Sequence, residues 1–191
     1  METMKRNLGP VVGLYPTPVT VVGTESGGKA NWMVIAHIGL IGRENIMLSV
    51  RKTHYSNVAI MDNKTASVNL IRSEMLKETD YIGMVSGNDE DKSDIFEYYH
   101  GSLKGAPLIN NSPISMECEV VDVYDIETHS NYILRVVNTY ADEDVLDENG
   151  NIDYEKVAPV LFEMPQGTYM SSGKTIAKCW DEGKGYENKN K

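Results

Sequence analysis

The stretch Ile114-Ser115-Met116-Glu117-Cys118-Glu119-Val120-Val121-Asp122-Val123 decides the fold class. Apolar side chains at 114, 116, 118 and 120 alternate with polar ones, which is the pattern of a strand with one buried face. The alternation then changes parity, because Val121 and Val123 continue on the other face. One extra residue of this kind predicts a β-bulge near Val120 and Val121, and a bulge bends a strand around a barrel. We therefore expect a curved, mainly β fold.

Further strand patterns lie on both sides of this stretch. Residues 131–140 predict an antiparallel neighbour, joined to it by a turn near 128–130. Other apolar runs predict strands at 19–23, 31–38, 46–50 and 66–71 and one last strand between 160 and 170. Because hairpins connect most of these strands, the sequence predicts a Greek-key or up-and-down barrel.

A few helices interrupt the predicted strands. We expect short helices at about 53–62, from Ser73 as the cap towards Ile82, at about 91–99, and at 154–158. The long segment 83–111 is rich in turn residues, and a long, weakly ordered segment commonly covers a functional site. The predicted class is therefore mainly β with inserted helices.

Composition limits the classes of partner. The 191 residues carry a formal net charge of −10, which argues against a nucleic-acid or anionic-membrane partner. The longest apolar segment, 32–41, is interrupted by His37 and Gly39 and is too short to span a bilayer. The first ten residues lack the apolar stretch of a secretory signal, and two distant cysteines give no disulfide framework, so we expect a cytoplasmic protein. We expect one domain at 1–180 and a polar tail at 181–191.

The stretch Ser49-Val50-Arg51-Lys52-Thr53-His54-Tyr55-Ser56 is a candidate anion site. It places two cations, a histidine and four hydroxyls between a predicted strand and a predicted helix. A phosphate there would meet helix N–H groups, a guanidinium and hydroxyl donors. The alternative is a solvated helix entrance with Thr53 as the N-cap. Both interpretations are consistent with these residues alone.

Several other motifs do not fit their templates. The segment 167–175 resembles a P-loop, but five residues separate its glycines instead of four. The loop containing Asn149-Gly150 lacks the acidic first and last ligands of a calcium loop. The four histidines show no zinc-ligand spacing, and no G-x-S-x-G motif is present. We therefore predict no metal site and no hydrolytic chemistry.

A set of motifs occurs in a characteristic order along the chain. They are Tyr15-Pro16-Thr17-Pro18-Val19, Asn31-Trp32-Met33-Val34-Ile35-Ala36-His37, the candidate anion site 49–56, Val68-Asn69-Leu70, Thr79-Asp80-Tyr81-Ile82-Gly83, Ser86-Gly87-Asn88-Asp89-Glu90-Asp91-Lys92, Ala106-Pro107-Leu108-Ile109, Met116-Glu117-Cys118-Glu119-Val120 and Gly173-Lys174-Thr175-Ile176-Ala177-Lys178. This succession resembles the flavin reductase-like, FMN-binding split-barrel family, in particular its flavoredoxin-type members, over roughly residues 15–178. Ile82 stands where many relatives carry cysteine, so no thiol role is implied at that position.

The resemblance implies a fold, an assembly and a cofactor site. It implies a homodimer of Greek-key-like split barrels that binds one FMN per subunit near the interface. The implied contacts to the flavin ring come from the strand at 31–36, and those to the ribityl chain and phosphate from 49–56, with the 86–92 loop closing the site. The residues implied to bind the cofactor are Asn31, Met33, Val34, Ile35, Ala36, Ser49, Val50, Arg51, Tyr55, Ser56, Ser86, Gly87 and Lys92.

The resemblance also implies an activity. It implies an oxidoreductase in which FMN accepts a hydride at N5 from NADH or NADPH and passes electrons to an acceptor that the sequence does not name. No catalytic side chain is implied, because the cofactor carries the chemistry. Two alternatives are an FMN-carrying electron-transfer protein reduced by a protein partner, and a flavin-binding module without turnover. For Lys92, a solvated ion pair with its acidic neighbours is an alternative to cofactor binding.

Overall fold

The computed structural model describes residues 4–186 of the chain, and strands predominate in it. The strands are β1 (Thr17–Pro18), β2 (Thr20–Ser26), β3 (Lys29–Ile35), β4 (Ile38–Leu40), β5 (Asn45–Arg51), β6 (Thr65–Leu70), β7 (Tyr98–His100), β8 (Pro107–Ile109), β9 (Ile114–Ile126), β10 (His129–Ala141), β11 (Val160–Glu163) and β12 (Thr168–Ser171). The helices are α1 (Tyr55–Asn63), α2 (Leu76–Met84) and α3 (Tyr154–Val157), with 3₁₀ turns η1 (Ser73–Met75) and η2 (Glu143–Val145). None of the described helices has the length and apolar character needed to cross a membrane.

A seven-stranded antiparallel sheet forms a partly closed barrel, with strand order β3-β2-β6-β9-β10-β5-β4. β6 returns beside β2, and β10 lies beside β5, so neighbours in the sheet are not always neighbours in sequence. The edge strand β3 contacts β5 near the other end of the sheet, and the chain continues from β3 through His37, whose carbonyl accepts the Ser49 N–H at 3.0 Å, into β4. The barrel is therefore split between β3 and β5, and the predicted mainly β, Greek-key-like split-barrel class is confirmed.

The predicted bulge lies where the parity of the apolar pattern changes. Ile133 pairs with Asp122 and Leu134 with Val120, which leaves Val121 as the extra residue of β9. The β5–β10 ladder, in contrast, pairs seven consecutive residues without a shift, from His129 opposite Arg51 to Arg135 opposite Asn45. The curvature is therefore taken up between β9 and β10, and the register between β10 and β5 is undisturbed.

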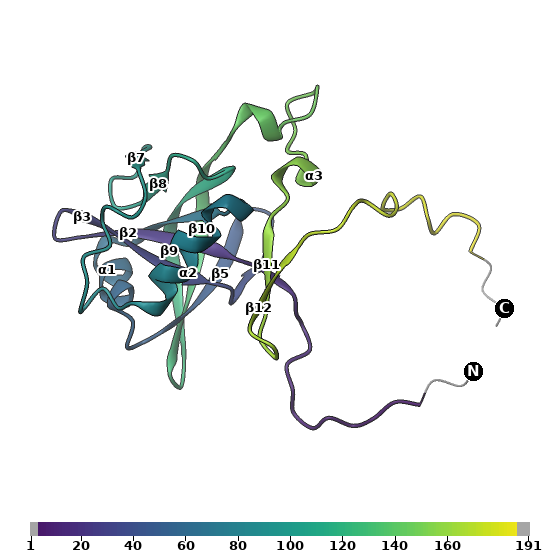
Figure 1. The fold of residues 1–191 in the computed structure, drawn as a ribbon, viewed down its shortest axis with the longest axis horizontal. Helices are drawn as coiled ribbons and strands as arrows, with labels where there is room; N and C mark the ends of the chain where they lie inside the picture. The colour runs from purple at the N-terminus through teal and green to yellow at the C-terminus, as the bar shows by residue number, and fades with distance from the viewer. Residues whose placement is uncertain (1–3, 187–191) are drawn as a thin grey trace.

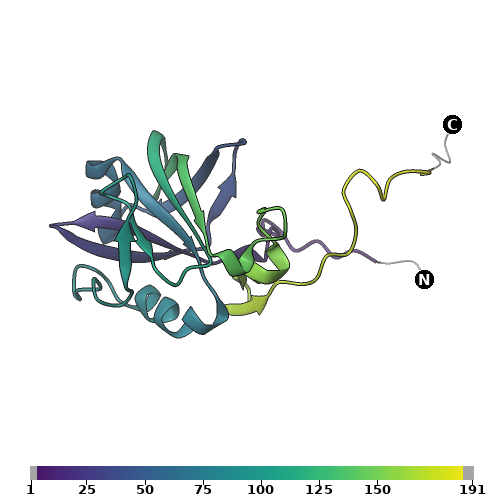
Figure 2. The same cartoon turned by 90° about the horizontal axis from the view of Figure 1, so that it is seen from above.

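Two apolar cores lie on opposite faces of β3. Met33 and Ile35 point into the barrel core, together with Leu48, Ile60 and Leu134. Trp32 belongs to a second core, which α2, the segment around Phe96, β8 and β11 build outside the barrel. Alternation along one edge strand thus attaches α2 to the barrel beside the split. Figures 1 and 2 show both ends of the described chain leaving the barrel on the β11–β12 side.

Four sequence-based expectations need correction. The segment expected to be helical at 91–99 forms turns and then β7, because the Asp91 carboxylate accepts the Ser93 N–H and fixes a local turn. Ser73 makes no side-chain cap and begins a 3₁₀ turn instead. The single strand expected between 160 and 170 is a hairpin, β11 and β12, and the strand expected at 31–38 is interrupted at Ala36 and His37.

The chain termini carry less regular structure. After Ser171 the chain has no strand or helix as far as residue 186, and residues 187–191 of the expected tail lie outside the described residues. The domain boundary at residue 180 stays a prediction. The arms at 4–16 and 172–186 expose large apolar side chains, including Leu14, Ile176 and Trp180.

Candidate functional site

A three-part groove runs along the split of the barrel, between α1, α2 and the loop at 85–92. We name its parts the Lys29 hollow, the Ser56 hollow and the His129 hollow after one lining residue of each. The first two share Tyr55, Gly87 and Lys92, and the last two share Val34 and His54 among others, so the three form one continuous surface. The His129 hollow has a volume of about 510 Å³, which lies in the 300–1,000 Å³ range typical of small-molecule sites.

All the sequence-predicted cofactor residues except Val50 line this groove. The Lys29 hollow contains Asn31, and the Ser56 hollow contains Met33, Ser56 and Ser86. These two hollows share Tyr55, Gly87 and Lys92. The His129 hollow contains Ile35, Ala36, Ser49 and Arg51, and it shares Val34 with the Ser56 hollow. The Val50 side chain is instead fully buried in the barrel core, because it follows the opposite parity on β5 to Ser49 and Arg51. Only the Val50 backbone is left to approach a ligand.

The start of α1 is open to the groove. His54 occupies the N-cap position, no side chain caps the helix, and its first turn carries no acidic residue. The interpretation of Thr53 as the N-cap is therefore wrong. The first N–H groups of a helix have no partner inside it, and they favour a negative charge. This helix end is suited to an anion.

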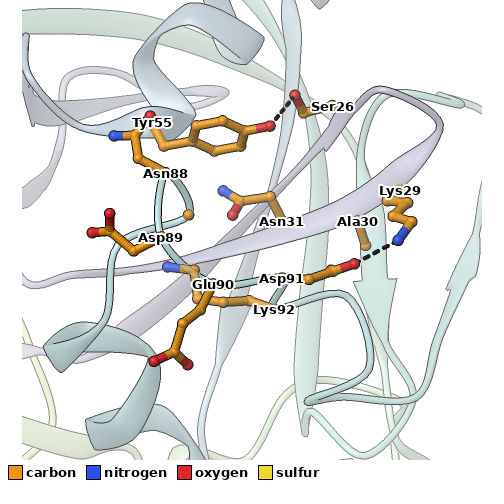
Figure 3. A pocket seen from close by; sticks show the side chains of 11 residues that line it. Ser26, Lys29, Ala30, Asn31, Tyr55, Asn88, Asp89, Glu90, Asp91 and Lys92 are labelled. Carbon is orange, nitrogen blue, oxygen red and sulfur yellow. Dashed lines mark hydrogen bonds and ion pairs between the residues drawn. The ribbon is translucent and has the colours of Figure 1, made fainter.

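Hydrogen bonds hold the middle of the groove in shape. The Asn31 side-chain N–H donates to Ser56 Oγ at 2.6 Å. Ser26 Oγ lies 2.9 Å from the Tyr55 hydroxyl, as Figure 3 shows. Gly87 lies against both partners, since a Cβ at this position would stand 2.6 Å from Asn31 Oδ1 and 2.7 Å from a Tyr55 ring carbon. Glycine is required here so that the loop backbone can approach β3 and α1.

Lys92 is buried, with only 6% of its surface exposed. Its Nζ donates to the carbonyl oxygens of Ile82 and Val85, at 3.2 and 3.3 Å, and so caps the C-terminal end of α2. Burial lowers the pKa of Lys92, and the nearby Glu90 charge partly opposes this. The alternative interpretation of Lys92 as a solvated ion pair is wrong. The ammonium group of Lys92 therefore lies at the floor shared by the Lys29 and Ser56 hollows.

The charges in the groove are distributed unevenly along its length. Lys29 forms an exposed ion pair with Asp91, and Asp89 and Glu90 line the same hollow (Figure 3). The hydrogen bond from Lys29, together with those from Ser93, holds the pKa of Asp91 well below its usual range. Among residues 4–186, the Ser56 and His129 hollows contain one carboxylate between them, that of Asp80. The groove is therefore acidic at the Lys29 hollow and becomes cationic towards the His129 hollow.

The β11–β12 hairpin forms a wall that the sequence analysis missed. Phe162, Met164 and Tyr169 line the His129 hollow, and the Tyr169 hydroxyl donates to Asp80 of α2 at 2.7 Å. Burial, together with this bond, raises the pKa of Tyr169 to about 12. The apolar pattern at 160–170 signalled a strand, but no sequence signal indicated that the strand folds back over a groove formed by β3 and β5.

Comparison with known proteins identifies the family. Residues 12–163 match the model of the flavin reductase like domain. The chain also resembles the flavoredoxin of Methanosarcina acetivorans, with 34% identity, a TM-score of 0.91 and coverage of 95% of this chain and 98% of that one. The chain belongs to the flavin reductase-like family.

Other solved structures match this chain over most of their length. The flavoredoxin of Desulfovibrio vulgaris (Miyazaki F) is 29% identical, with a TM-score of 0.87 and coverage of 95% of this chain and 100% of that chain. An FMN-binding protein from Thermus thermophilus shares the fold at 20% identity, with a TM-score of 0.77 and coverage of 93% of this chain and 100% of that one. A comparison with curated protein sequences gave no match.

The groove fits the flavin that the flavin reductase-like family implies. A flavin nucleotide combines a flat, largely apolar ring with a charged phosphate. The groove offers an apolar wall of Val34, Phe162 and Met164 at the split, and hydroxyl groups and cations beside the uncapped end of α1. The residues present therefore match both parts of such a ligand.

Proposed function

We propose that this protein binds FMN in the three-part groove and acts as an NAD(P)H-dependent oxidoreductase. The observation that carries the proposal is the pairing of an apolar wall with a cationic, uncapped helix start inside one continuous groove. When bound, FMN supplies a hydride acceptor at its N5 atom and a donor of electrons to a further acceptor. The protein residues then have to bind, orient and shield the ring and phosphate, and no side-chain acid or base is required.

Each part of the groove has its own proposed role. Met33, Val34, Ile35 and Ala36 contact the ring, and Asn31 is held beside it by its bond to Ser56. Ser49, Arg51, Tyr55 and Ser56 bind the ribityl chain and phosphate. Ser86, Gly87 and Lys92 close the site from the loop that follows α2.

The direct test is spectroscopic. We expect the purified protein, after incubation with FMN and removal of excess ligand, to retain flavin absorbance that bleaches when NADH or NADPH is added without oxygen. A protein that retains no flavin would contradict the proposal. Retained flavin that no reductant bleaches would indicate a binding module without turnover.

Arg51→Ala tests the phosphate contacts within the same proposal. Loss of a charge-assisted hydrogen bond is expected to weaken FMN binding by about 1.5 to 3 kcal/mol. Lys52→Ala is the matched control, because Lys52 lies next in sequence but pairs with Asp125 at 3.0 Å on the exposed surface. Equal effects of the two substitutions on FMN affinity would show that the phosphate lies elsewhere.

A second candidate function is that of an electron carrier reduced by a protein partner. The carboxylates of Asp89, Glu90 and Asp91 line the outer end of the groove and favour a partner with a basic surface. Bleaching by a cognate reductase system, combined with no bleaching by NADH or NADPH, would favour this function over the first.

We also propose a homodimer. The arms at 4–16 and 172–186 extend from the barrel and expose apolar side chains, with Ile176 99% and Trp180 95% accessible in the single chain. A second copy of the chain would remove these side chains from water. Light scattering is expected to give twice the 21.3 kDa mass of the chain, and a single-chain mass at all concentrations would contradict it.

A further inference from the structure

The four histidines of the chain differ in how their ring nitrogens are used. Nε2 of His37 lies 3.1 Å from the Tyr15 hydroxyl, and Nε2 of His100 lies 3.5 Å from a carboxylate oxygen of Glu25. His54 and His129 use only Nδ1, towards Met33 Sδ at 3.3 Å and Thr128 Oγ1 at 2.9 Å. Within residues 4–186, Nε2 of His54 and of His129 has no hydrogen-bond partner.

His54 and His129 also line the same part of the groove. Both border the His129 hollow together with Arg51 and Ser49. His129 lies directly opposite Arg51 in the β10–β5 ladder, and His54 stands at the N-cap of α1. Two ring nitrogens free to bind a ligand thus lie in the same hollow as a guanidinium and beside an uncapped helix start, and these groups come from β5, β10 and the start of α1.

We propose that His54 and His129 bind the phosphate of FMN, His54 as an imidazolium and His129 as an N–H donor through Nε2. This inference rests on the proposed function and adds two residues to the phosphate site. His129 extends the proposed phosphate site beyond the stretch at 49–56, because it comes from a strand more than seventy residues further along the chain.

The different roles follow from the partners at Nδ1. The thioether sulfur of Met33 can only accept, so Nδ1 of His54 carries a proton, and in the neutral ring Nε2 is a bare lone pair that repels an oxyanion. His54 must therefore take up a second proton before it binds phosphate. The hydroxyl of Thr128 can donate to Nδ1 of His129, which leaves the proton of the neutral ring on Nε2.

The charges around His54 determine the sign of the pH dependence. Burial, and then the charges of Arg51, His129 and Lys92, lower the pKa of His54. Asp80 of α2 is the carboxylate that lines this hollow, and its Oδ1 is occupied by Tyr169. A dianionic phosphate would offset the surrounding cations, so its binding takes up a proton and becomes stronger as pH falls.

The test compares FMN with riboflavin, which has the same ring but no phosphate. We would measure both dissociation constants by flavin fluorescence quenching between pH 8.5 and 6.5, above the second phosphate pKa of about 6. The preference for FMN over riboflavin should rise about threefold to tenfold as pH falls across this window, the range for uptake of up to one proton. In His54→Gln the preference should lose this pH dependence.

His129→Gln gives the complementary result. The preference for FMN should fall about threefold to tenfold at every pH, while its rise at lower pH remains, since a donor is weakened and His54 still titrates. His100→Gln on β7 is the matched control and should behave like the unsubstituted protein. Riboflavin binding in each variant reports whether the ring site is intact.

Three outcomes would overturn the assignment. An FMN preference that does not vary with pH, or that varies equally in His54→Gln, removes the role of His54. A pH-dependent preference for NADPH over NADH, without one for FMN over riboflavin, would assign the two histidines to the dinucleotide. Binding of neither FMN nor riboflavin would overturn the proposed function itself.

Discussion

The structure contains two buried charges, Glu117 on β9 and Lys92 beside the groove, and they are satisfied in different ways. Glu117 has no exposed surface, and its two oxygens accept five hydrogen bonds, from the Ser102 N–H and hydroxyl, the Leu103 N–H, the Asn138 amide and the Tyr140 hydroxyl. Lys92 makes two long bonds to backbone carbonyls, and within the described part of the chain its remaining N–H has no hydrogen-bond partner.

The difference separates a structural charge from one available to a ligand. A buried carboxylate with all its acceptor sites in use fixes the elements that donate to it, which here are the loop at 101–103 and β10. A buried ammonium with a spare donor and a pKa lowered by burial is stabilised further by any anion that reaches it. We therefore expect substitutions at Glu117 to affect folding and those at Lys92 to affect ligand binding.

The largest expected effect is that of Glu117→Gln on stability. The substitution turns an acceptor into a donor facing N–H groups and removes the charge, and we expect a loss of about 3 to 4 kcal/mol in the free energy of unfolding. Urea unfolding would measure it. Glu119→Gln is the control, because Glu119 forms an exposed pair with Arg135 and should cost less than about 1 kcal/mol. Similar losses of unfolding free energy in both variants would show that Glu117 has no special structural role.

Acid unfolding sharpens the same contrast. Burial raises the pKa of Glu117, but the hydrogen bonds from Ser102, Asn138 and Leu103 outweigh it and bring the pKa down to about 2. A carboxylate with a lowered pKa stabilises the fold above its ordinary pKa of 4.5, and this contribution is lost as pH falls to about 2. Stability should therefore fall more steeply in the unsubstituted protein than in Glu117→Gln over this range, as measured by urea unfolding at each pH. Parallel curves would contradict the assignment.

Substitutions of Gly101 and Gly87 are expected to have effects of intermediate size, the first on stability and the second on flavin binding. A Cβ on Gly101 would stand 2.5 Å from Glu117 Oε2, and one on Gly87 would stand 2.6 Å from Asn31 Oδ1. Gly101→Ala should lower the free energy of unfolding by about 1 to 3 kcal/mol, the usual cost of overpacking. Gly87→Ala should instead weaken flavin binding about tenfold, since it displaces Asn31 and Tyr55. The contrast fails if both substitutions change the same quantity.

Lys92→Met has the smallest expected effect on stability. Methionine replaces the buried aliphatic part of the lysine side chain without its charge, and the two carbonyls at the end of α2 lose their donor. We therefore expect the free energy of unfolding to fall by about 1 kcal/mol. FMN affinity should fall about tenfold in the same variant, while riboflavin affinity changes less. A large loss of stability with unchanged FMN affinity would show that Lys92 acts as Glu117 does.

Much of the barrel could be predicted from the sequence, because its strands follow local rules. The alternation from Ile114 onward, its change of parity at Val121 and the neighbouring strand are all encoded within thirty residues. The helix predicted from Asp91 failed because a side-chain bond to the backbone, which helix propensity does not describe, competes locally. Glu117 was predicted to face away from the buried side, yet it is buried by partners in the loop at 101–103 and on β10.

The candidate site was predictable where its residues share one stretch of chain. Ser49, Arg51, Tyr55 and Ser56 lie between one strand and one helix, and the structure brings them to the groove with Asn31. The resemblance implied Val50 together with them, but the parity of β5 sends its side chain into the core. His129 and Phe162 come from distant strands, so only the folded barrel shows that they belong to the groove.

The extra residue at Val121, one of two register shifts between β9 and β10, has a consequence for how this barrel tolerates insertions and deletions. Deleting Val121 would invert the facing of every side chain on one half of β9 relative to its partner strand. The deletion would then either expose apolar residues of β9 or shift the register of β10 along β5. The second outcome would move His129 away from Arg51. An extra residue that lies outside the groove thus lets β9 curve while β10 and β5 keep the register that places His129 opposite Arg51.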